Sequence, residues 1–457
     1  MKPAPEPRDR PGSRWQGIDG FHDLLSVHTR HPDRYPFFLE SVAQGPPHAR
    51  YDILFALPEE RIIQEAAAPA SDFLARLEMA LQRERVETLC HAPVPFHGGW
   101  FVFLGYELAQ SIEPSLALAT GQPQDWPVAL AVRCKAAIVR DHVAHQTWLV
   151  AESNHEAVWA TLLHDLNSVE TVRMNWNLPE QVRQVEEDSA LYLGRIERVR
   201  EYIRAGETYQ VNLSRRWTVD FAEPPSPAAL YARLRVANPA PFSGLAVFDR
   251  RHAIISSSPE RLVSVHNGNI STRPIAGTWP RTGDSTLASQ QVAALRQNPK
   301  ERAEHVMLVD LERNDLGRVC RQGTVRADEL LTVESYRHVH HLVSNISGEL
   351  RPDVTPVDVI RAVFPGGTIT GCPKVRTMQI IAEQEAAPRG AYTGSMGYIN
   401  CDGSMDLNIL IRTMTLRDQH LEWRAGGGIV ADSDPQRELN ETRAKAKGLL
   451  AALASQG

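Results

Sequence analysis

Strand-like segments recur along this chain without the regular strand–helix rhythm of a parallel sheet. Residues 51–57, 100–104 and 128–139 are rich in Val, Ile, Phe and Trp between Pro and Gly, which predicts strands. Longer helical patterns lie at about 287–312, 355–363, 374–384 and 436–455. This irregular mixture disfavours a doubly wound parallel sheet and predicts an α+β fold with large antiparallel or mixed sheets and flanking helices.

The 457 residues divide near residue 180. Residues 1–14 are rich in Pro and charged side chains, which predicts a disordered lead. A polar stretch at 175–188 carries Pro179 and predicts a linker. It separates an N-terminal region at 15–175 from a C-terminal region at 188–457.

Composition excludes several classes of function. The chain is 42% hydrophobic and carries a net charge of −6, so it offers no broad positive field for nucleic acid or anionic lipid. Apolar runs are too short for a membrane span and no secretory signal precedes them, so we expect a cytoplasmic protein. The five cysteines form no CxxC pair, which disfavours a disulfide framework or a structural zinc site.

Two distant helical segments each carry a pair of glutamates at a spacing of three. A rotation of 100° per residue puts Glu301 and Glu304 on the same stripe as apolar residues of their helix. On the last helix, Glu438 and Glu441 share a stripe with Lys445. Buried carboxylates usually need a cation, and four hard oxygen ligands suit Mg²⁺. Surface decoration of the two helices is the alternative.

Three glycine-bearing stretches, at 273–278, 364–374 and 425–433, adjoin predicted strands. None matches a Walker A loop or a dinucleotide fingerprint, so no nucleotide site is predicted. Each stretch can present backbone N–H groups to a carboxylate, and Arg412 and Lys445 could add charge-assisted hydrogen bonds. Plain turns and a surface ion pair are the alternatives.

Glu260 follows a predicted strand and Pro259, where a turn would hold its carboxyl at a fixed angle. Such a carboxyl suits a general acid if its pKa is raised.

His338 and His340 share one face of an alternating segment and His341 points to the other. These histidines could bind a metal ion as a pair; the alternative is that they are exposed to solvent or hydrogen-bonded.

An ordered series of motifs resembles those of the chorismate-utilising enzymes. They are YQVNL (209–213), SPER (258–261), RPIAGT (273–278), RAEH (302–305), VDLERND (309–315), HLVS (341–344), FPGGTITG (364–371), GGGIVADS (426–433) and NET (440–442). The family includes anthranilate synthase component I, aminodeoxychorismate synthase component I, isochorismate synthase and salicylate synthase. The resemblance implies a four-layer α/β/β/α sandwich of two large antiparallel sheets, with chorismate and Mg²⁺ between them. Upstream, residues 36–42 and 50–54 resemble the N-terminal region of the aminating members.

The resemblance also implies roles for single residues. Glu304 and Glu441 are similar to direct Mg²⁺ ligands, and Glu301 and Glu438 to carboxylates that reach the metal through water. Glu260 resembles the acid that protonates the departing C4 hydroxyl of chorismate. The residues that resemble groups holding the two substrate carboxylates are Gly277, Thr278, Tyr398, Arg412, Gly427 and Lys445.

The residue at position 210 separates family members that add water from those that add ammonia. The water-adding members resemble this chain in the surrounding motif but have a Lys, acting as general base, at the position of Gln210. This chain has Gln210, and a neutral amide cannot deprotonate water, so the expected nucleophile is ammonia. His341 resembles a histidine near the substrate ring. Because none of the cysteines lies in a Gly-flanked catalytic motif, ammonia must come from a separate glutamine amidotransferase subunit or from solution.

The motifs at 209–213, 364–371 and 51–54 resemble the aminodeoxychorismate branch. The first hypothesis is therefore aminodeoxychorismate synthase component I, which makes 4-amino-4-deoxychorismate for para-aminobenzoate and folate synthesis by a transaminase-class amination. One position departs from that branch: its members usually carry a Lys that attacks ring C2 where this chain has Ala276. With Ala276, either ammonia itself serves in the first step or C2 is the aminated position.

Two alternatives therefore remain. Amination at C2 would make the chain an anthranilate synthase component I, as Ala276 suggests. A non-catalytic homologue that senses chorismate or tryptophan is the other, because Glu40 and Ser41 lie in a segment that resembles the tryptophan-binding segment of the aminating members.

Overall fold

The computed structural model describes residues 14–20, 22–43, 49–66, 72–86, 92–118, 126–152, 157–169, 176–280, 285–335 and 339–454. The predicted lead at 1–14 lies outside these residues except for Arg14, where the first strand begins. His338 also lies outside them.

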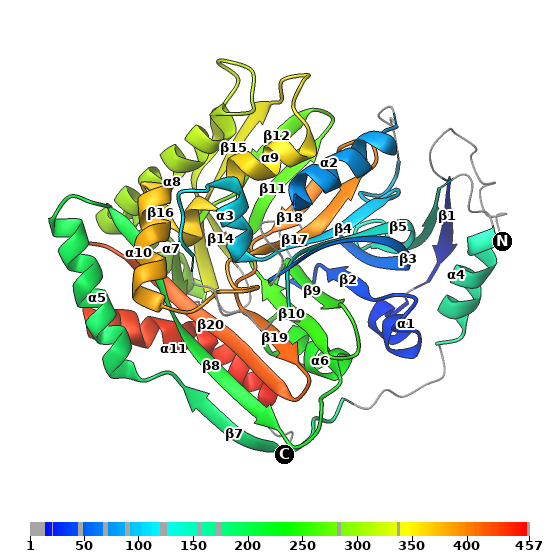
Figure 1. Cartoon of the computed structure of the whole chain (residues 1–457), viewed down its shortest axis with the longest axis horizontal. Coiled ribbons are helices and arrows are strands. Elements are labelled where there is room, and N and C mark those ends of the chain that lie inside the picture. The colour runs from blue at the N-terminus through cyan, green and yellow to red at the C-terminus, as the bar shows by residue number, and fades with distance from the viewer. Residues whose placement is uncertain are drawn as a thin grey trace.

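The described residues form helices and strands in irregular alternation (Figure 1). The strands are β1 (Arg14–Asp19), β2 (Phe37–Glu40), β3 (Tyr51–Glu65), β4 (Gly99–Leu104), β5 (Pro127–Asp141), β6 (Gln146–Ala151), β7 (Gln181–Glu186), β8 (Gln210–Phe221), β9 (Phe242–Val247), β10 (His252–Ser258), β11 (Arg261–His266), β12 (Asn269–Thr272), β13 (Ile275–Pro280), β14 (Arg326–Ser335), β15 (Val339–Glu349), β16 (Gly371–Cys372), β17 (Ser395–Asn400), β18 (Met405–Asn408), β19 (Thr413–Arg417) and β20 (His420–Ile429). The α-helices are α1 (Leu24–Arg30), α2 (Phe73–Arg83), α3 (Ala109–Ile112), α4 (Ala157–Asn167), α5 (Ser189–Arg204), α6 (Pro227–Ala237), α7 (Ser285–Gln297), α8 (Pro299–Gly317), α9 (Pro356–Val363), α10 (Lys374–Glu385) and α11 (Pro435–Leu453). Short 3₁₀ helices are η1 (Tyr106–Leu108) and η2 (Gly367–Ile369).

The strands hydrogen-bond into one antiparallel sheet of 20 strands. Its main path runs β7–β8–β20–β19–β10–β9–β2–β3–β5–β4–β17–β18–β11–β12–β15, with β13 and β14 paired to β15 at the far end. The predicted α+β fold with large antiparallel sheets and flanking helices is therefore confirmed. The two sheets of the sandwich are joined by hydrogen bonds into a single curled sheet.

Strands from the two predicted regions pair with each other. Strand β2 pairs with β9, and β4 pairs with β17, so the N-terminal strands sit in the middle of the path. The predicted linker at 175–188 is wrong in part, because it contains β7, which pairs with β8 at the sheet edge. Most β7 side chains are exposed, and their polar character hid a strand that buries little on either face.

Proline and capping residues set where the helices near the site begin. The helical pattern at 287–312 is two helices, α7 and α8, because Pro299 has no N–H to continue the first. Pro299 instead occupies the first position of α8, where the N–H would have no partner. Helix α9 begins at a capping box in which Thr355 and Asp358 each accept the other's backbone N–H.

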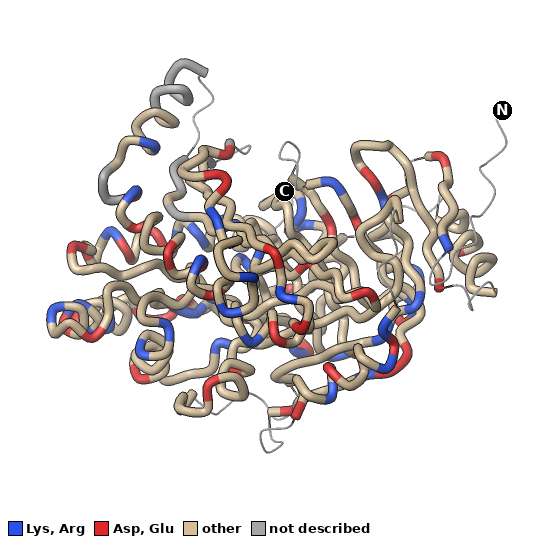
Figure 2. Tube along the Cα trace, turned by 90° about the horizontal axis from the view of Figure 1, so that it is seen from above, with Lys and Arg blue, Asp and Glu red and all other residues tan. Residues whose placement is uncertain are grey.

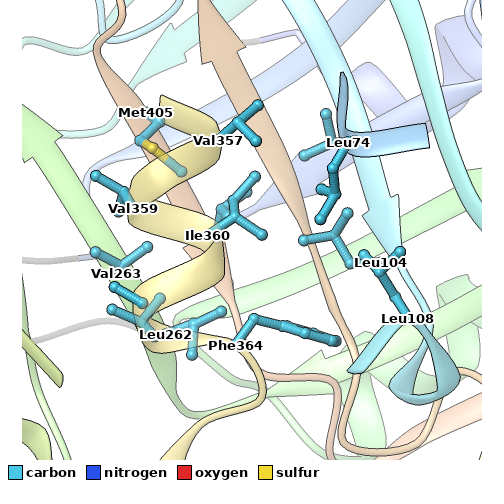
Figure 3. Packing of buried hydrophobic residues seen from close by; sticks show 14 of the residues in the cluster. Leu74, Leu104, Leu108, Leu262, Val263, Val357, Val359, Ile360, Phe364 and Met405 are labelled. Atoms are coloured by element: carbon cyan, nitrogen blue, oxygen red, sulfur yellow. The ribbon is translucent and has the colours of Figure 1, made fainter. Parts of the chain in front are cut away.

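Helix α9 closes one hydrophobic core of the molecule (Figure 3). Its buried Val357 and Ile360 face Leu74 of α2 and Leu104 of β4, with Phe364 just beyond the helix end. Burial of each large aliphatic side chain contributes about 1.5–3 kcal/mol relative to exposure. This packing holds the segment that follows Phe364, a glycine turn that reaches the site.

Charged side chains of both signs are interspersed over the chain (Figure 2). None of the described helices is long and apolar enough to cross a membrane. Among the described cysteines, Cys134, Cys320, Cys372 and Cys401 are free thiols.

Candidate active site

A cavity of about 460 Å³ lies between the two ends of the curled sheet. One wall comes from β8, β20 and α11 and contributes Gln210, Asn212, Ala425, Gly426, Gly428, Glu438, Glu441 and Lys445. The facing wall comes from β13, β15, α8 and the turn before β11 and contributes Glu260, Ile275, Gly277, Glu301, Glu304, Leu308 and His341. Most of the residues predicted to form a site therefore meet, although they are spread over more than 200 positions of sequence.

Two predicted residues lie beside the cavity lining. Gly427 sits between two lining glycines of β20, and a Cβ built on it would lie 3.4 Å from Glu438 Oε2 and 3.6 Å from Glu441 Oε1. Thr278 pairs with His341 through its backbone, but its side chain lies outside the described part of the structure, as does that of Ala276.

The two helices that carry the glutamate pairs, α8 and α11, lie on opposite walls of the cavity. Helix α8 packs against β13 and β15, and Asn298 accepts the Glu301 N–H at 3.2 Å at the helix start. Leu308 is buried one turn after Glu304, as the apolar stripe predicted. Helix α11 packs on β20, and its first turn begins at Asp434, whose carboxylate accepts the Arg437 N–H at 2.8 Å.

Carboxylates of both helices lie close to glycines of the sheet, which have no side chain to fill the space between them. A Cβ on Gly277 would lie 2.6 Å from Glu301 Oε2, and Gly277 has a φ of 74°, a conformation that favours glycine. Glu438 is buried and accepts a hydrogen bond from the Ser433 hydroxyl at 2.8 Å. Glu441 pairs with Lys445 at 2.8 Å. The glycines thus leave room between the carboxylates for a ligand.

This donor set fits a hard divalent cation by its chemistry, since carboxylate oxygens are the ligands that Mg²⁺ prefers. Among the described residues, however, no three Asp, Glu, His or Cys side chains are grouped closely enough to hold a metal ion. A cation here would therefore need ligands from a bound substrate and from water.

Glu260 has the properties of a general acid. The turn after β10 buries it, and burial raises the pKa of its carboxyl to about 7. The Thr368 hydroxyl, the Ile275 N–H at 3.3 Å, and the charges of Arg412 and Lys445 partly oppose this rise. Glu260 can therefore be protonated near neutral pH and release that proton.

Arg412 and His341 face the same space. Arg412 has a positive φ of 51°, and burial lowers the pKa of its guanidinium, which the Glu260 charge opposes. Burial lowers the pKa of His341 to about 3, and the Arg412 charge adds to the effect. At neutral pH the cavity therefore holds a neutral imidazole beside a cation that can bind an anion.

Next to the cavity, a buried ionic network supports the wall formed by β8 and β20. Glu385 accepts hydrogen bonds from Arg389 at 2.7 Å and from Arg424 at 3.0 Å, and these charges lower the pKa of its carboxyl to about 2. Arg389 also donates to the Asn212 carbonyl at 2.7 Å. The network fixes the backbone from which cavity side chains project.

The prediction for Tyr398 needs correction. Tyr398 lies on β17 in the middle of the sheet path, and its ring packs edge-on against Phe96 with centroids 5.7 Å apart. It lines a separate cavity of about 100 Å³ together with Glu40 and Ser41. Tyr392 lines the main cavity instead.

The small cavity contains the candidate tryptophan segment. Glu40 accepts hydrogen bonds from the Tyr231 hydroxyl at 2.7 Å and from Arg235 at 3.1 Å. The Ser41 N–H donates to Asp52 at 2.9 Å. Burial raises the pKa of Glu40 to about 7, and the nearby Asp52 charge adds to the rise.

Several cavity residues are not indicated by sequence pattern. No periodic pattern in the sequence indicates Tyr392, which lies in a turn before β17, or Arg424, which lines the cavity from β20. Thr368 lies in the glycine-bearing stretch at 364–374, which predicts backbone N–H groups for a carboxylate but assigns no role to the Thr368 side chain. Asn212 was visible as a polar residue in the alternation of β8, on the same face as Gln210.

Comparisons with known proteins agree with this geometry. Residues 35–451 match the family model described as chorismate binding enzyme. A Synechocystis sp. protein named anthranilate synthase component I-like is 43% identical over 365 residues, which cover 79% of this chain and 73% of that protein. Aminodeoxychorismate synthase component 1 of Escherichia coli K12 is 37% identical, with 89% of this chain and 90% of that protein covered.

The fold has a solved relative. Anthranilate synthase component I from Streptococcus pneumoniae TIGR4 superposes with a TM-score of 0.78 at 32% identity, covering 89% of this chain and 93% of that one. The chain belongs to the chorismate binding enzyme family. Its relatives include proteins named anthranilate synthase and proteins named aminodeoxychorismate synthase.

Proposed function

We propose that this chain is the synthase subunit that converts chorismate and ammonia to 4-amino-4-deoxychorismate, an aminodeoxychorismate synthase component I acting in para-aminobenzoate and folate synthesis. The observation that carries the proposal is Glu260, a buried carboxyl with a pKa of about 7 that faces two cations in a cavity containing a neutral amide, Gln210. This combination supports acid-assisted loss of a hydroxyl and addition of ammonia.

Chorismate carries two carboxylates, and the cavity offers cations for them. Arg412 binds one carboxylate through its guanidinium, whose burial makes an anionic partner favourable. Lys445 donates a hydrogen bond to the Gly426 carbonyl at 2.8 Å, which holds its ammonium at the glycine face of β20. Together they orient the ring so that its C4 hydroxyl faces Glu260.

Glu301, Glu304, Glu438 and Glu441 would hold Mg²⁺ jointly with a substrate carboxylate and water. The cation would supply charge neutralisation for that carboxylate. Lys445 limits the negative charge of this cluster through its ion pair with Glu441.

Glu260 gives its proton to the C4 oxygen as the C4–O bond breaks, which releases water. The ammonia lone pair forms a C–N bond at C2 during that step, and the proton lost from nitrogen returns to the Glu260 carboxylate. A second ammonia then forms the C4–N bond while Glu260 gives its proton to the C2 nitrogen, the C2–N bond breaks and the first ammonia leaves. The proton lost from the C4 nitrogen returns to the Glu260 carboxylate. The net change is chorismate and ammonia to aminodeoxychorismate and water, and it needs no amine from position 276, where this chain has Ala276.

Anthranilate synthase component I is the second candidate, and Ala276 favours it. In that reaction the C2-aminated product would remain bound and lose pyruvate to give anthranilate. In either reaction, a glutamine amidotransferase subunit would supply ammonia. The relatives' names, component I and component 1, support such a partner. Glu40 and Ser41 would bind tryptophan in the small cavity.

A product assay tests the proposal. The purified chain is incubated with chorismate, Mg²⁺ and ammonium, and a lyase specific for the 4-amino product is then added. We expect para-aminobenzoate only after the lyase. Fluorescent anthranilate without the lyase would establish the second candidate instead. A Glu260→Ala variant that consumes chorismate as fast as wild type would exclude Glu260 as the acid, and a wild-type chain that consumes no chorismate would favour the non-catalytic hypothesis.

A further inference from the structure

Two buried amide oxygens on β8 have no hydrogen-bond partner among the described residues. They are Gln210 Oε1 and Asn212 Oδ1. Gln210 is 4% exposed and Asn212 is 9% exposed, and both side chains line the main cavity. A buried acceptor without a partner costs about 1–3 kcal/mol, so two of them on one strand face indicate a ligand that donates hydrogen bonds.

The structure holds both amides in place. Asn212 Nδ2 donates to the Thr368 carbonyl at 3.3 Å, which leaves Oδ1 as the free acceptor. The Asn212 backbone is fixed on both sides, because its N–H donates to the Thr370 carbonyl and its carbonyl accepts from Arg389. The Gln210 amide lies across Gly428, where a Cβ would come within 2.3 Å of Nε2.

We propose that Gln210 and Asn212 bind the ammonia nucleophile through these two carbonyl oxygens. The inference rests on the proposed amination of chorismate. Ammonia has three N–H donors and one lone pair, so two donated hydrogen bonds orient the lone pair without consuming it. Neither amide can remove a proton, which excludes activation of water by this pair but suits ammonia, already a nucleophile when neutral.

The position relative to the acid is also suitable. Thr368 contacts both groups, since its carbonyl accepts from Asn212 and its hydroxyl faces Glu260. Ammonia held by the two amides would therefore lie in the same part of the cavity as the hydroxyl that Glu260 protonates. Asn212 thereby becomes a nucleophile-binding residue, a role no motif had assigned to it.

The test uses Gln210→Met and Asn212→Leu, which keep approximate side-chain size and remove the acceptor. Initial rates of chorismate loss are measured against ammonium concentration at constant pH and ionic strength with saturating chorismate and Mg²⁺, and then against chorismate at saturating ammonium. We expect each variant to raise KM for ammonia about fivefold. The double variant should raise it at least as much as either single variant, and the two effects should not simply multiply, because both amides bind one ligand. KM for chorismate should change less than about twofold. Gln184→Met on exposed β7 is the matched control and should change neither constant.

The outcomes separate this inference from the function on which it rests. Wild-type chorismate loss that does not depend on ammonium would overturn the proposed function. Ammonium dependence in wild type with an unchanged ammonia KM in both variants would overturn only the ammonia site. An equal rise of both constants would also overturn it, because the amides would then bind chorismate. Folding of each variant is checked by near-UV circular dichroism.

Discussion

Replacing Glu260 by Gln should stabilise the folded chain at alkaline pH while it removes catalysis. The folded carboxyl has a pKa of about 7 against an ordinary value of 4.5, because burial disfavours its charged form. The folded state therefore binds more protons than the unfolded state between these two pH values, and its stability falls as pH rises through that window. Gln is neutral at every pH and can still accept the Ile275 N–H.

The size of the effect follows from linkage. At about 1.4 kcal/mol for each pKa unit, the ionised Glu260 costs the folded state about 3 kcal/mol above pH 7. A chain of 457 residues has an unfolding entropy of about 1 kcal/mol/K near its melting temperature. Glu260→Gln should therefore melt about 3 °C above wild type at pH 8.5 and within about 0.5 °C of it at pH 4.5.

Differential scanning calorimetry of wild type and variant at both pH values, with chelator present, measures the effect. Glu223→Gln, at an exposed position between β8 and α6, is the control and should leave the melting temperature unchanged at both. The same Glu260→Gln variant should lose about 10²–10⁴-fold in kcat, since the acid is gone. A melting temperature equal to wild type at pH 8.5, or a shift of the same size at pH 4.5, would refute the raised pKa.

Three further outcomes are expected. Arg412→Ala should raise KM for chorismate about 100-fold, measured by initial rates, because it removes a buried partner of a substrate carboxylate. Glu385→Gln should lower stability by about 3–5 kcal/mol, since Arg389 and Arg424 lose their shared anion; exposed Glu223→Gln should change it by less than about 0.5 kcal/mol. Chelation of Mg²⁺ should abolish turnover reversibly, and Glu438→Gln should raise the Mg²⁺ concentration needed for half-maximal rate about tenfold.

Short-range sequence periodicity predicted several residues of the site, because the side chains that share one face of a helix follow from residue spacing alone. The stripe that carries Glu301 and Glu304 depends only on helical periodicity, and so does the stripe that Glu438 and Glu441 share with Lys445. The break at Pro299 was equally readable from the missing N–H, although the helical pattern on either side concealed it.

Tyr398 shows where local pattern stops. Tyr392 and Tyr398 lie six residues apart near the same sheet, and only the pairing of β17 with β4 and β18 determines which one reaches the main cavity. Similarly, the polarity of β7 predicted a linker, since a strand exposed on both faces has no apolar alternation.

The sequence by itself determined the α+β class, the acidic helix faces and the neutral residue at position 210, since each follows from residue type and short-range periodicity. Only the tertiary structure decided that β8 and β15, at opposite ends of the sheet path, face each other across one cavity. It also decided the chemistry of Glu260, because the pKa of a carboxyl depends on the solvent that the rest of the chain excludes from it. The orphaned oxygens of Gln210 and Asn212 exist for the same reason: burial removes the water that would otherwise be their partner.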